Sequence, residues 1–366
     1  MEKTFVPDRS AYEFILGRLP SDGPAVLATV VEAEESTPQV PGASAVIGAG
    51  GLLFGTVGGG IVEARTIRAG RAALARRRSR ILSFNLANAY SAERDAVCGG
   101  RMTILLEAGP GENRPALRDL VAAVGRRRSG VLATFVQEKS SSVRRRWFSS
   151  AGRGPAPACR PWARFREEAA AAARDGQPRW RRVEGGWLYL EPHAPAPRLL
   201  IAGAGHVGRA VALQGKLLGF EVTVVDDRPE LANGEAVPSA DRFVVGPVGP
   251  SLARLLLGRD AYVVIATRGH RHDAEALRAC IRRPTGYLGM IGSGRKVGLM
   301  REEFLRRGWA DAAEWGRVHT PIGLPVGSRT VPEIAVSIAA EIVAARRSPS
   351  TNRSFSPVRT ETSERD

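Results

Sequence analysis

The sequence predicts an α/β protein in which an N-terminal mixed α/β domain is followed by a Rossmann-type, doubly wound parallel sheet. Two observations predict this class. An apolar run over residues 198–202 leads directly into a glycine-rich turn and then into a helical pattern, which is how a dinucleotide-binding fold begins. Buried strands and helices alternate from there to about residue 290, whereas the earlier strands follow no regular repeat.

The first segment, residues 10–137, is expected to form the mixed α/β domain. Its apolar residues follow strand patterns in most places and helical spacing in two. The expected elements are a helix over 11–19, a buried strand over 25–32, short strands over 44–48 and 51–55, a helix over 61–77, and strands over 80–85 and 102–107.

Residues 138–197 are expected to be a variable loop and linker. Runs of serine, arginine, glycine and proline up to residue 157 predict an exposed loop, followed by a helix near 165–174 and a strand over 187–190. The stretch 192–197 predicts a stiff joint, because each proline fixes its own φ angle. The domains expected after it are the Rossmann domain over 198–346 and a disordered polar tail over 347–366.

The turn at Gly203, Gly205 and Gly208 is the firmest feature of the sequence. The first glycine makes the tight turn, the second lets the backbone approach a pyrophosphate, and the third lets the helix pack on the strand. His206 opens that helix, whose N-terminus carries partial positive charge for the phosphates. The alternative is a Rossmann-like fold that binds no ligand.

The next strand, over 221–225, ends at Asp226. A carboxylate at this place would accept hydrogen bonds from ribose hydroxyls and repel a 2′-phosphate, which favours NAD over NADP. Arg228 follows closely and weakens that preference. The expected cofactor of this domain is therefore NAD(P) or another nucleotide.

Two further motifs follow strands expected over 262–267 and 286–290, at the edge where ligands bind in such sheets. His270 and His272 are candidates for metal binding, anion binding or proton transfer. The alternative is a polar loop in which Asp273 caps a helix. The second motif resembles an anion-binding nest, and its alternative is an ordinary helix start. Its candidate residues are Ser293, Arg295 and Lys296.

In the first segment, Gly58, Gly59 and Gly60 directly precede a helix, so the backbone there can approach an anion closely. Cys98 stands beside two glycines just before a strand, where a thiol is expected to be accessible. The alternative for Cys98 is a small buried hydrophobic residue, which is the expectation for Cys159 and Cys280.

The net charge of +16 raises nucleic-acid binding as a hypothesis. Only four of the 53 basic residues are lysines, and the arginine runs lack interleaved aromatic residues, so we expect no nucleic-acid partner. No long apolar run predicts a membrane span, and the N-terminus lacks the apolar core of a signal peptide. Three scattered cysteines form no disulfide framework, and a cytoplasmic protein is expected.

Eight motifs in this order resemble the xanthine dehydrogenase accessory proteins, the XdhC/CoxI family, between about residues 25 and 345. The stretches that carry the resemblance are 28–32, 41–43, 55–60, 98–100, 203–208, 267–270, 287–293 and 332–341. Many members of that family have a cysteine directly after the three glycines, where this chain has Ile61.

The resemblance implies a chaperone-like maturation factor rather than an enzyme. Such a protein binds the molybdenum cofactor (molybdopterin or its dinucleotide) and assists its sulfuration and its insertion into an apo molybdenum hydroxylase of the xanthine or carbon monoxide dehydrogenase type. A cysteine desulfurase would be the sulfur donor. The resemblance makes Cys98 the candidate metal ligand or sulfur carrier, while Arg295, Lys296 and the glycine loops would bind phosphates.

Two other functions stay open. One is an NAD(P)-dependent oxidoreductase in which His270 or His272 is the acid–base group; the lack of a recognisable Lys–Asp or Ser–Tyr–Lys set disfavours it. The other is a binding module that regulates its partner enzyme through a nucleotide. A homodimer is a further expectation, because a small α/β first domain leaves strand edges to cover.

Overall fold

The computed structural model describes residues 10–20, 23–86, 99–150 and 160–347. The chain divides into two compact units, Met1–Pro195 and Ala196–Asp366, and each is described by itself. The division falls within the proline-rich stretch 192–197.

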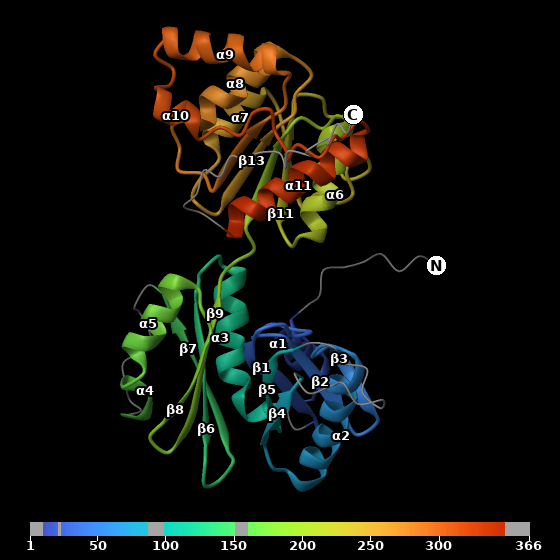
Figure 1. Ribbon diagram of the computed structural model, residues 1–366, viewed down its shortest axis with the longest axis vertical. Helices are drawn as coiled ribbons and strands as arrows, with labels where there is room; N and C mark the ends of the chain where they lie inside the picture. Colours follow the sequence, from blue (N-terminus) through green and yellow to red (C-terminus); the bar gives the residue numbers. More distant parts are fainter. Residues whose placement is uncertain (1–9, 21–22, 87–98, 151–159, 348–366) are drawn as a thin grey trace, which may run out of the picture. The chain divides into compact units, whose positions relative to one another are not determined.

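The first unit begins with a five-stranded antiparallel sheet of order β3-β2-β1-β5-β4 (Figure 1). Helix α2 packs on its apolar face, where side chains such as Ile47 and Ile104 are fully buried. The capping box of Ser10 and Glu13 starts helix α1. The bounds are α1 (Ala11–Arg18), β1 (Val26–Glu34), β2 (Ser44–Gly48), β3 (Gly51–Gly55), α2 (Gly60–Arg76), β4 (Arg80–Asn85) and β5 (Arg101–Ala108).

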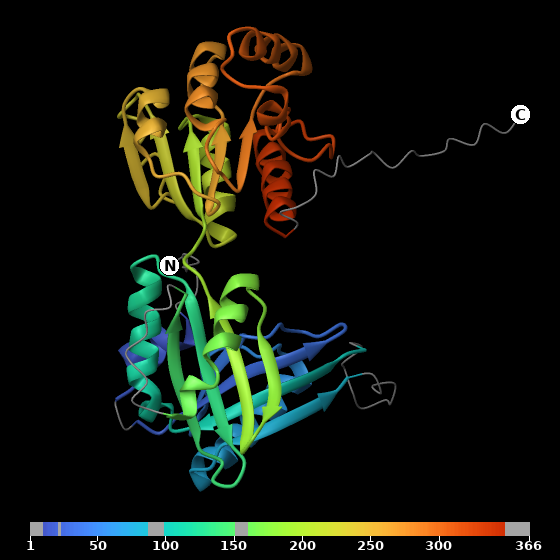
Figure 2. The same cartoon turned by 90° about the vertical axis from the view of Figure 1, so that its left-hand side faces the viewer.

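A four-stranded antiparallel sheet of order β7-β6-β9-β8 completes the first unit (Figure 2). Helix α3 packs against β6 and β7, and α5 packs against β6 and β9. The bounds are η1 (Pro110–Asn113), α3 (Arg114–Gly125), β6 (Gly130–Gln137), β7 (Val143–Ser149), α4 (Arg160–Ala163), α5 (Arg166–Asp175), β8 (Arg179–Val183) and β9 (Gly186–His193).

This second sheet corrects the loop expected over residues 138–157, because β7 occupies its middle part. The strand was missed because Arg145 points inward and is buried, while Arg144 is exposed. A buried arginine hides the alternation of apolar and polar residues by which a strand is recognised.

A buried polar cluster explains the inward position of Arg145. Its guanidinium contacts Glu107 of β5 at 2.8 Å and also lies near the Tyr12 hydroxyl. That hydroxyl donates to Glu191 of β9 at 2.6 Å, and His193 lies 3.0 Å from the same carboxylate. We call these five residues the buried cluster; it joins α1 to strands of both sheets.

The second unit is a five-stranded, all-parallel sheet of order β12-β11-β10-β13-β14 (Figure 2). Helices α6 and α11 cover one face, while α7, α8, α9 and α10 pack on the other. The bounds of the strands are β10 (Arg198–Ala202), β11 (Glu221–Asp226), β12 (Arg242–Val245), β13 (Ala261–Ile265) and β14 (Tyr287–Met290). The bounds of the helices are α6 (His206–Leu217), α7 (Val248–Arg254), α8 (His270–Cys280), α9 (Gly294–Arg306), α10 (Ala312–Gly316) and α11 (Val331–Arg347).

The expected fold class is therefore confirmed. The strand order turns back at β10, which has β11 on one side and β13 on the other. Ligands of doubly wound sheets bind at such a switch point, outside the carboxyl ends of the strands. Cys280 is fully buried as expected, and burial raises the pKa of its thiol to about 12.

Candidate functional site

The three glycines of the turn between β10 and α6 have distinct physical roles. Gly203 has a φ angle of +115°, and a Cβ on it would lie 2.3 Å from the Ala266 carbonyl oxygen. A Cβ on Gly208 would lie 1.9 Å from the Gly203 carbonyl oxygen. A Cβ on Gly205 would meet nothing within 4 Å. The first and third glycines are thus required by packing, whereas the second leaves open space above the turn.

Helix α6 begins at His206, whose side chain is exposed. Its N-cap residue is Gly205, so no side chain caps the first turn. Uncapped N–H groups at a helix N-terminus, together with the helix dipole, favour an anion such as a phosphate. The open space at Gly205 therefore lies where a phosphate group would be bound.

Asp226, the last residue of β11, is only 2% exposed. Its carboxylate accepts a hydrogen bond from the Ala204 N–H at 2.7 Å and is held by the Arg228 guanidinium at 2.8 and 2.9 Å. Burial alone would raise the pKa of Asp226, but the hydrogen bonds from Arg228 and Ala204 lower it to about 2. Asp226 thereby ties β11 to the glycine turn.

The loop after β13 lies beside that turn. A Cβ on Gly203 would lie 3.1 Å from the Cα of Thr267. From the same loop, Arg268 donates to Asp227 at 2.8 Å, so this ion pair joins the ends of β13 and β11. Since these strands flank β10, the pair spans the switch point of the sheet.

Asp273 is fully buried in the first turn of α8. It accepts a hydrogen bond from the Thr267 hydroxyl at 2.6 Å and also pairs with the Lys296 ammonium group of α9. The alternative in which Asp273 is the helix cap is wrong, because the N-cap residue is Gly269. The carboxylate instead holds together the polar segments that follow β13 and β14.

His270 and His272 lie in the first turn of α8 rather than in a loop. They stand two positions apart, so their side chains point in different directions from the helix axis. Within the described residues, no group of three His, Cys, Asp or Glu side chains is placed to hold a metal ion. The two imidazoles remain candidates for anion binding or proton transfer.

Ser293 caps α9 by accepting from the Lys296 N–H at 3.4 Å. The Lys296 ammonium is engaged by Asp273, whereas Arg295 is exposed and forms no ion pair within the described part of the chain. Of the two cations predicted for an anion nest, Arg295 is therefore the one available to a ligand. We use the name carboxyl edge for the assembled residues 203–208, 226–228, 267–273 and 293–296.

In the first unit, Gly58, Gly59 and Gly60 all have positive φ angles, of 123°, 67° and 52°. Gly59 caps α2, and a Cβ on Gly59 or Gly60 would meet nothing within 4 Å. Glu63 accepts from the Thr56 hydroxyl at 2.6 Å and so fixes the start of this loop. The loop thus presents open backbone at a helix N-terminus, as its glycines predict.

Cys98 lies outside the described residues, so its expected role stays a prediction. Ile61, which stands where many relatives have a cysteine, is half-buried and packs against the core of the first sheet. Cys159 also lies outside the described residues.

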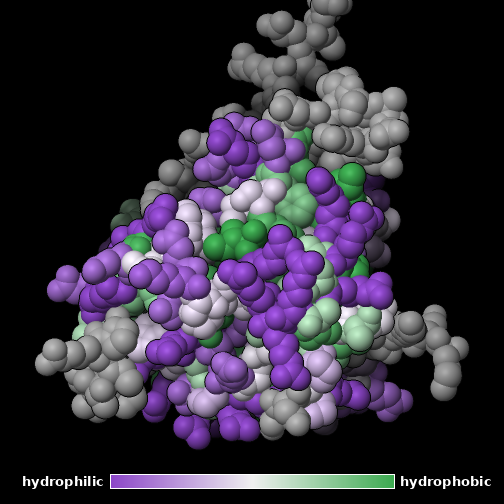
Figure 3. All heavy atoms as spheres, turned by 90° about the horizontal axis from the view of Figure 1, so that it is seen from below, coloured by the Kyte–Doolittle hydropathy of each residue, from purple (hydrophilic) through white to green (hydrophobic). Residues whose placement is uncertain are grey.

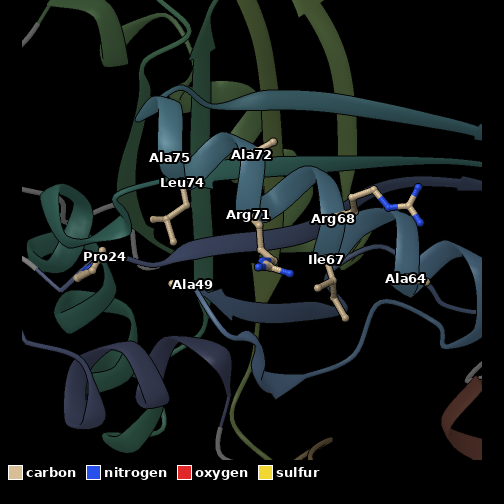
Figure 4. A pocket seen from close by; sticks show the side chains of 9 residues that line it. All are labelled: Pro24, Ala49, Ala64, Ile67, Arg68, Arg71, Ala72, Leu74 and Ala75. Atoms are coloured by element: carbon tan, nitrogen blue, oxygen red, sulfur yellow. The ribbon is translucent and has the colours of Figure 1, made fainter.

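A hollow of about 760 Å³ lies beside α2, between that helix and the segments that carry Pro24 and Ala49 (Figure 4). Four alanines line it together with Pro24, Ile67 and Leu74, and its charged residues are Arg68 and Arg71. None of the predicted site residues lines it.

On the face seen in Figure 3, hydrophilic side chains surround small separate apolar patches. No helix among the described residues is long and apolar enough to cross a membrane.

Two contacts of the carboxyl edge were not foreseen from the sequence. These are the Arg268–Asp227 pair and the Lys296–Asp273 pair. The second is an ion pair, which by itself does not test the expectation that the sequence holds no recognisable Lys–Asp catalytic set. Each joins residues far apart in the chain, and the only available signal was that both partners follow strands of the same sheet.

Comparison with known proteins gives two family matches. A family described as the XdhC Rossmann domain matches residues 199–342, and the XdhC and CoxI family matches residues 19–85. Seven of the eight stretches whose motifs suggested this resemblance lie within these matches, whereas the stretch 98–100, which contains Cys98, lies outside both.

Two curated relatives align with less than half of this chain, and the aligned part is also less than half of each relative. "Uncharacterized protein YqeB" of Escherichia coli (strain K12) is 36% identical over 157 residues, which is 43% of this chain and 28% of that protein. A protein of Bacillus subtilis (strain 168), described as a probable subunit of xanthine dehydrogenase, is 26% identical over 160 residues, 44% of this chain and 46% of that protein.

A solved structure shows the same fold over nearly the whole chain. It is a crystal structure described as a xanthine dehydrogenase from Bacillus halodurans. The TM-score is 0.73 at 22% sequence identity, with 94% of this chain and 97% of that chain covered. At this level of identity, the likeness concerns the fold alone.

Proposed function

Because the chain belongs to the XdhC and CoxI family, we propose that it is an accessory protein for a molybdenum hydroxylase of the xanthine or carbon monoxide dehydrogenase type. The family is associated with xanthine dehydrogenase maturation. In this proposal the protein binds the molybdenum cofactor, assists its sulfuration and delivers it to the apo-enzyme. The observation that carries it is the match of both family models to the segments that contain the two open glycine loops.

The described residues fit the phosphate-bearing parts of such a cofactor. At Gly59, Gly60 and Gly205, a Cβ would meet nothing within 4 Å, so a ligand can reach the backbone there. The N–H groups at the starts of α2 and α6 would bind phosphate oxygens. The cofactor would supply the metal centre used by the hydroxylase, whereas this chain holds and orients it.

The carboxyl edge also fits a nucleotide, either the dinucleotide part of the molybdenum cofactor or NAD(P). Its glycine turn, the start of α6 and Arg295 would receive the phosphates. Cys98 would contact molybdenum or carry its sulfur, with a cysteine desulfurase as the donor. A second copy of this chain is a further candidate partner, because β3 and β4 are edge strands of the first sheet.

The test is to co-express the chain with a hydroxylase, purify it, and measure its molybdenum and pterin content. We expect stoichiometric molybdopterin in the wild type and its loss in Cys98→Ser, because a thiolate is a soft ligand for the metal. Cys159→Ser is the matched control and should retain the cofactor. A wild-type protein without molybdenum or pterin would contradict the proposal.

A second candidate is an NAD(P)-dependent oxidoreductase, which the Lys296–Asp273 pair at the carboxyl edge favours. Paired ammonium and carboxylate groups can move a proton during hydride transfer. This function predicts substrate-dependent reduction of added NAD or NADP by the purified chain without any partner. Such turnover would support the oxidoreductase and contradict the accessory role. A chain that binds molybdopterin but reduces neither NAD nor NADP would contradict the oxidoreductase.

A further inference from the structure

We infer that Asp227, rather than Asp226, is the carboxylate that accepts the ribose hydroxyls of the bound nucleotide, and that it selects a ribose with a free 2′-hydroxyl. This inference rests on the proposed function insofar as the carboxyl edge binds a nucleotide. It assigns the specificity of that site to a residue that the sequence pattern did not single out.

Asp226 has no acceptor capacity left for a ribose. A carboxylate offers about four lone-pair sites, two on each oxygen. Oδ1 accepts from the N–H and the Nε of Arg228, at 3.0 and 2.8 Å. Oδ2 accepts from the Ala204 N–H and from the Arg228 guanidinium, at 2.7 and 2.9 Å. All the sites are used by the chain itself, and the side chain is only 3% exposed.

Asp227, the next residue, differs on each point. Its side chain is 32% exposed and accepts one hydrogen bond, from Arg268 at 2.8 Å. The other nearby cation, Arg228, is 3.9 Å away and is already engaged with Asp226. At least two lone-pair sites of Asp227 are therefore open to a ligand, which is the number that a ribose diol requires.

Asp227 also lies at the correct place in the sheet. It directly follows β11, and its partner Arg268 follows β13. These two strands flank β10, so the pair lies at the switch point with the glycine turn. A nucleotide whose phosphates meet the start of α6 would have its ribose near the end of β11, as in other dinucleotide-binding folds.

The charges favour a ribose without a 2′-phosphate. Arg228 neutralises Asp226, so the charges that remain at the end of β11, where the ribose would lie, are the Asp227 carboxylate and its partner Arg268. The carboxylate accepts hydrogen bonds from hydroxyls but repels a phosphate that carries nearly two negative charges. One arginine that is shared with a carboxylate does not offset that repulsion.

The test is calorimetric titration of the full-length protein with NAD⁺ and with NADP⁺. We expect the wild type to bind NAD⁺ at least about tenfold more tightly than NADP⁺. The variant Asp227→Asn should bind NAD⁺ about tenfold more weakly, which corresponds to about 1.4 kcal/mol, because a hydrogen bond to a charged acceptor is stronger than one to a neutral amide oxygen. It should also lose most of the discrimination against NADP⁺.

Glu275→Gln is the matched control, because Glu275 is another arginine-paired carboxylate of the second unit, where it pairs with Arg271. It should leave both affinities unchanged, which separates a direct contact from a change in net charge.

Tighter binding of NADP⁺ by the wild type, or unchanged NAD⁺ affinity in a folded Asp227→Asn protein, would overturn this inference and leave nucleotide binding intact. If neither nucleotide binds to the wild type, the NAD(P) part of the proposed function fails together with the inference.

Discussion

Both units of the protein contain a network of charged side chains, but the two networks differ in their access to solvent. In the buried cluster of the first unit, the side chains of Arg145 and Glu107 are each 1% exposed. At the carboxyl edge of the second unit, Asp227 and Arg268 are 32% and 49% exposed. The first network joins two sheets, whereas the second lies at a strand edge with open space above a glycine turn.

Burial therefore separates a structural network from a candidate binding site. Tyr189 lies near the buried cluster and is itself buried, and its hydroxyl has no hydrogen-bond partner among the described residues. Burial raises its pKa, and the neighbouring Glu191 raises it further. No large ligand can reach such groups. At the carboxyl edge, by contrast, Asp227 and Arg295 have unused hydrogen-bonding capacity that faces solvent.

The largest expected effect is on the buried cluster. Arg145→Met removes the cation beside Glu107 and leaves that carboxylate uncompensated in the interior. We expect the free energy of unfolding of the first unit to fall by about 3–5 kcal/mol, measured by urea denaturation with hydrogen exchange in β7. Arg182→Met breaks an exposed pair with Glu138 and should cost less than about 1 kcal/mol. Equal losses in the free energy of unfolding for the two variants would contradict the claim that the buried cluster stabilises the fold more than an exposed ion pair does.

The next effect compares two glycines of one turn. In Gly208→Ala, the new methyl group would meet the Gly203 carbonyl oxygen at 1.9 Å, so we expect a loss of about 2–3 kcal/mol in the stability of the second unit. In Gly205→Ala the methyl group enters open space and should cost about 1 kcal/mol or less. The Gly205→Ala variant should instead lose nucleotide affinity, about tenfold or more, because the methyl group takes the place of the phosphate.

Thermal unfolding would measure the stability of the two variants, and calorimetry would measure their nucleotide affinity. A Gly208→Ala protein as stable as the wild type would contradict the packing argument.

A smaller effect concerns acid. Asp226 has its pKa lowered from 3.8 to about 2 in the folded protein. A lowered folded-state pKa contributes stability that is fully present above the ordinary value and is lost as the pH falls through the folded-state value. The second unit should therefore lose stability between about pH 4 and pH 2. Asp226→Asn should be less stable at neutral pH and lack this part of the acid dependence; an unchanged pH profile would show that the carboxylate is not held as described.

The smallest effect is expected where the carboxyl edge is most exposed. Arg271 pairs with Glu275 one turn along α8, and its side chain is 88% exposed. Arg271→Ala should change the stability of the second unit by less than about 0.5 kcal/mol, because solvent screens such a pair. Chemical denaturation would measure this change, and a loss above about 1 kcal/mol would mean that the exposed pairs of the edge also stabilise the fold.

The sequence predicted the second unit more completely than the first for a physical reason. Strands buried on both faces, such as β13, read as continuous apolar runs, and the turn at Gly203 marks where the fold begins. The strand β7 was missed because its inward position is held by Arg145, whose partners are distant in the sequence. Asp227 was not singled out because the pattern of a dinucleotide-binding fold points to the last residue of the strand, which is Asp226. The pattern does not show that Ala204 and Arg228 already occupy the Asp226 carboxylate.

The central claim, that this chain delivers cofactor to a molybdenum hydroxylase, is tested most directly on the recipient enzyme. A xanthine dehydrogenase-type hydroxylase would be purified from cells that express it with or without this chain, and its molybdenum, pterin and cyanide-releasable sulfur would be measured. We expect an enzyme rich in sulfurated cofactor when the chain is present and a cofactor-poor enzyme when it is absent. Equal molybdenum and sulfur contents in the two preparations would contradict the account.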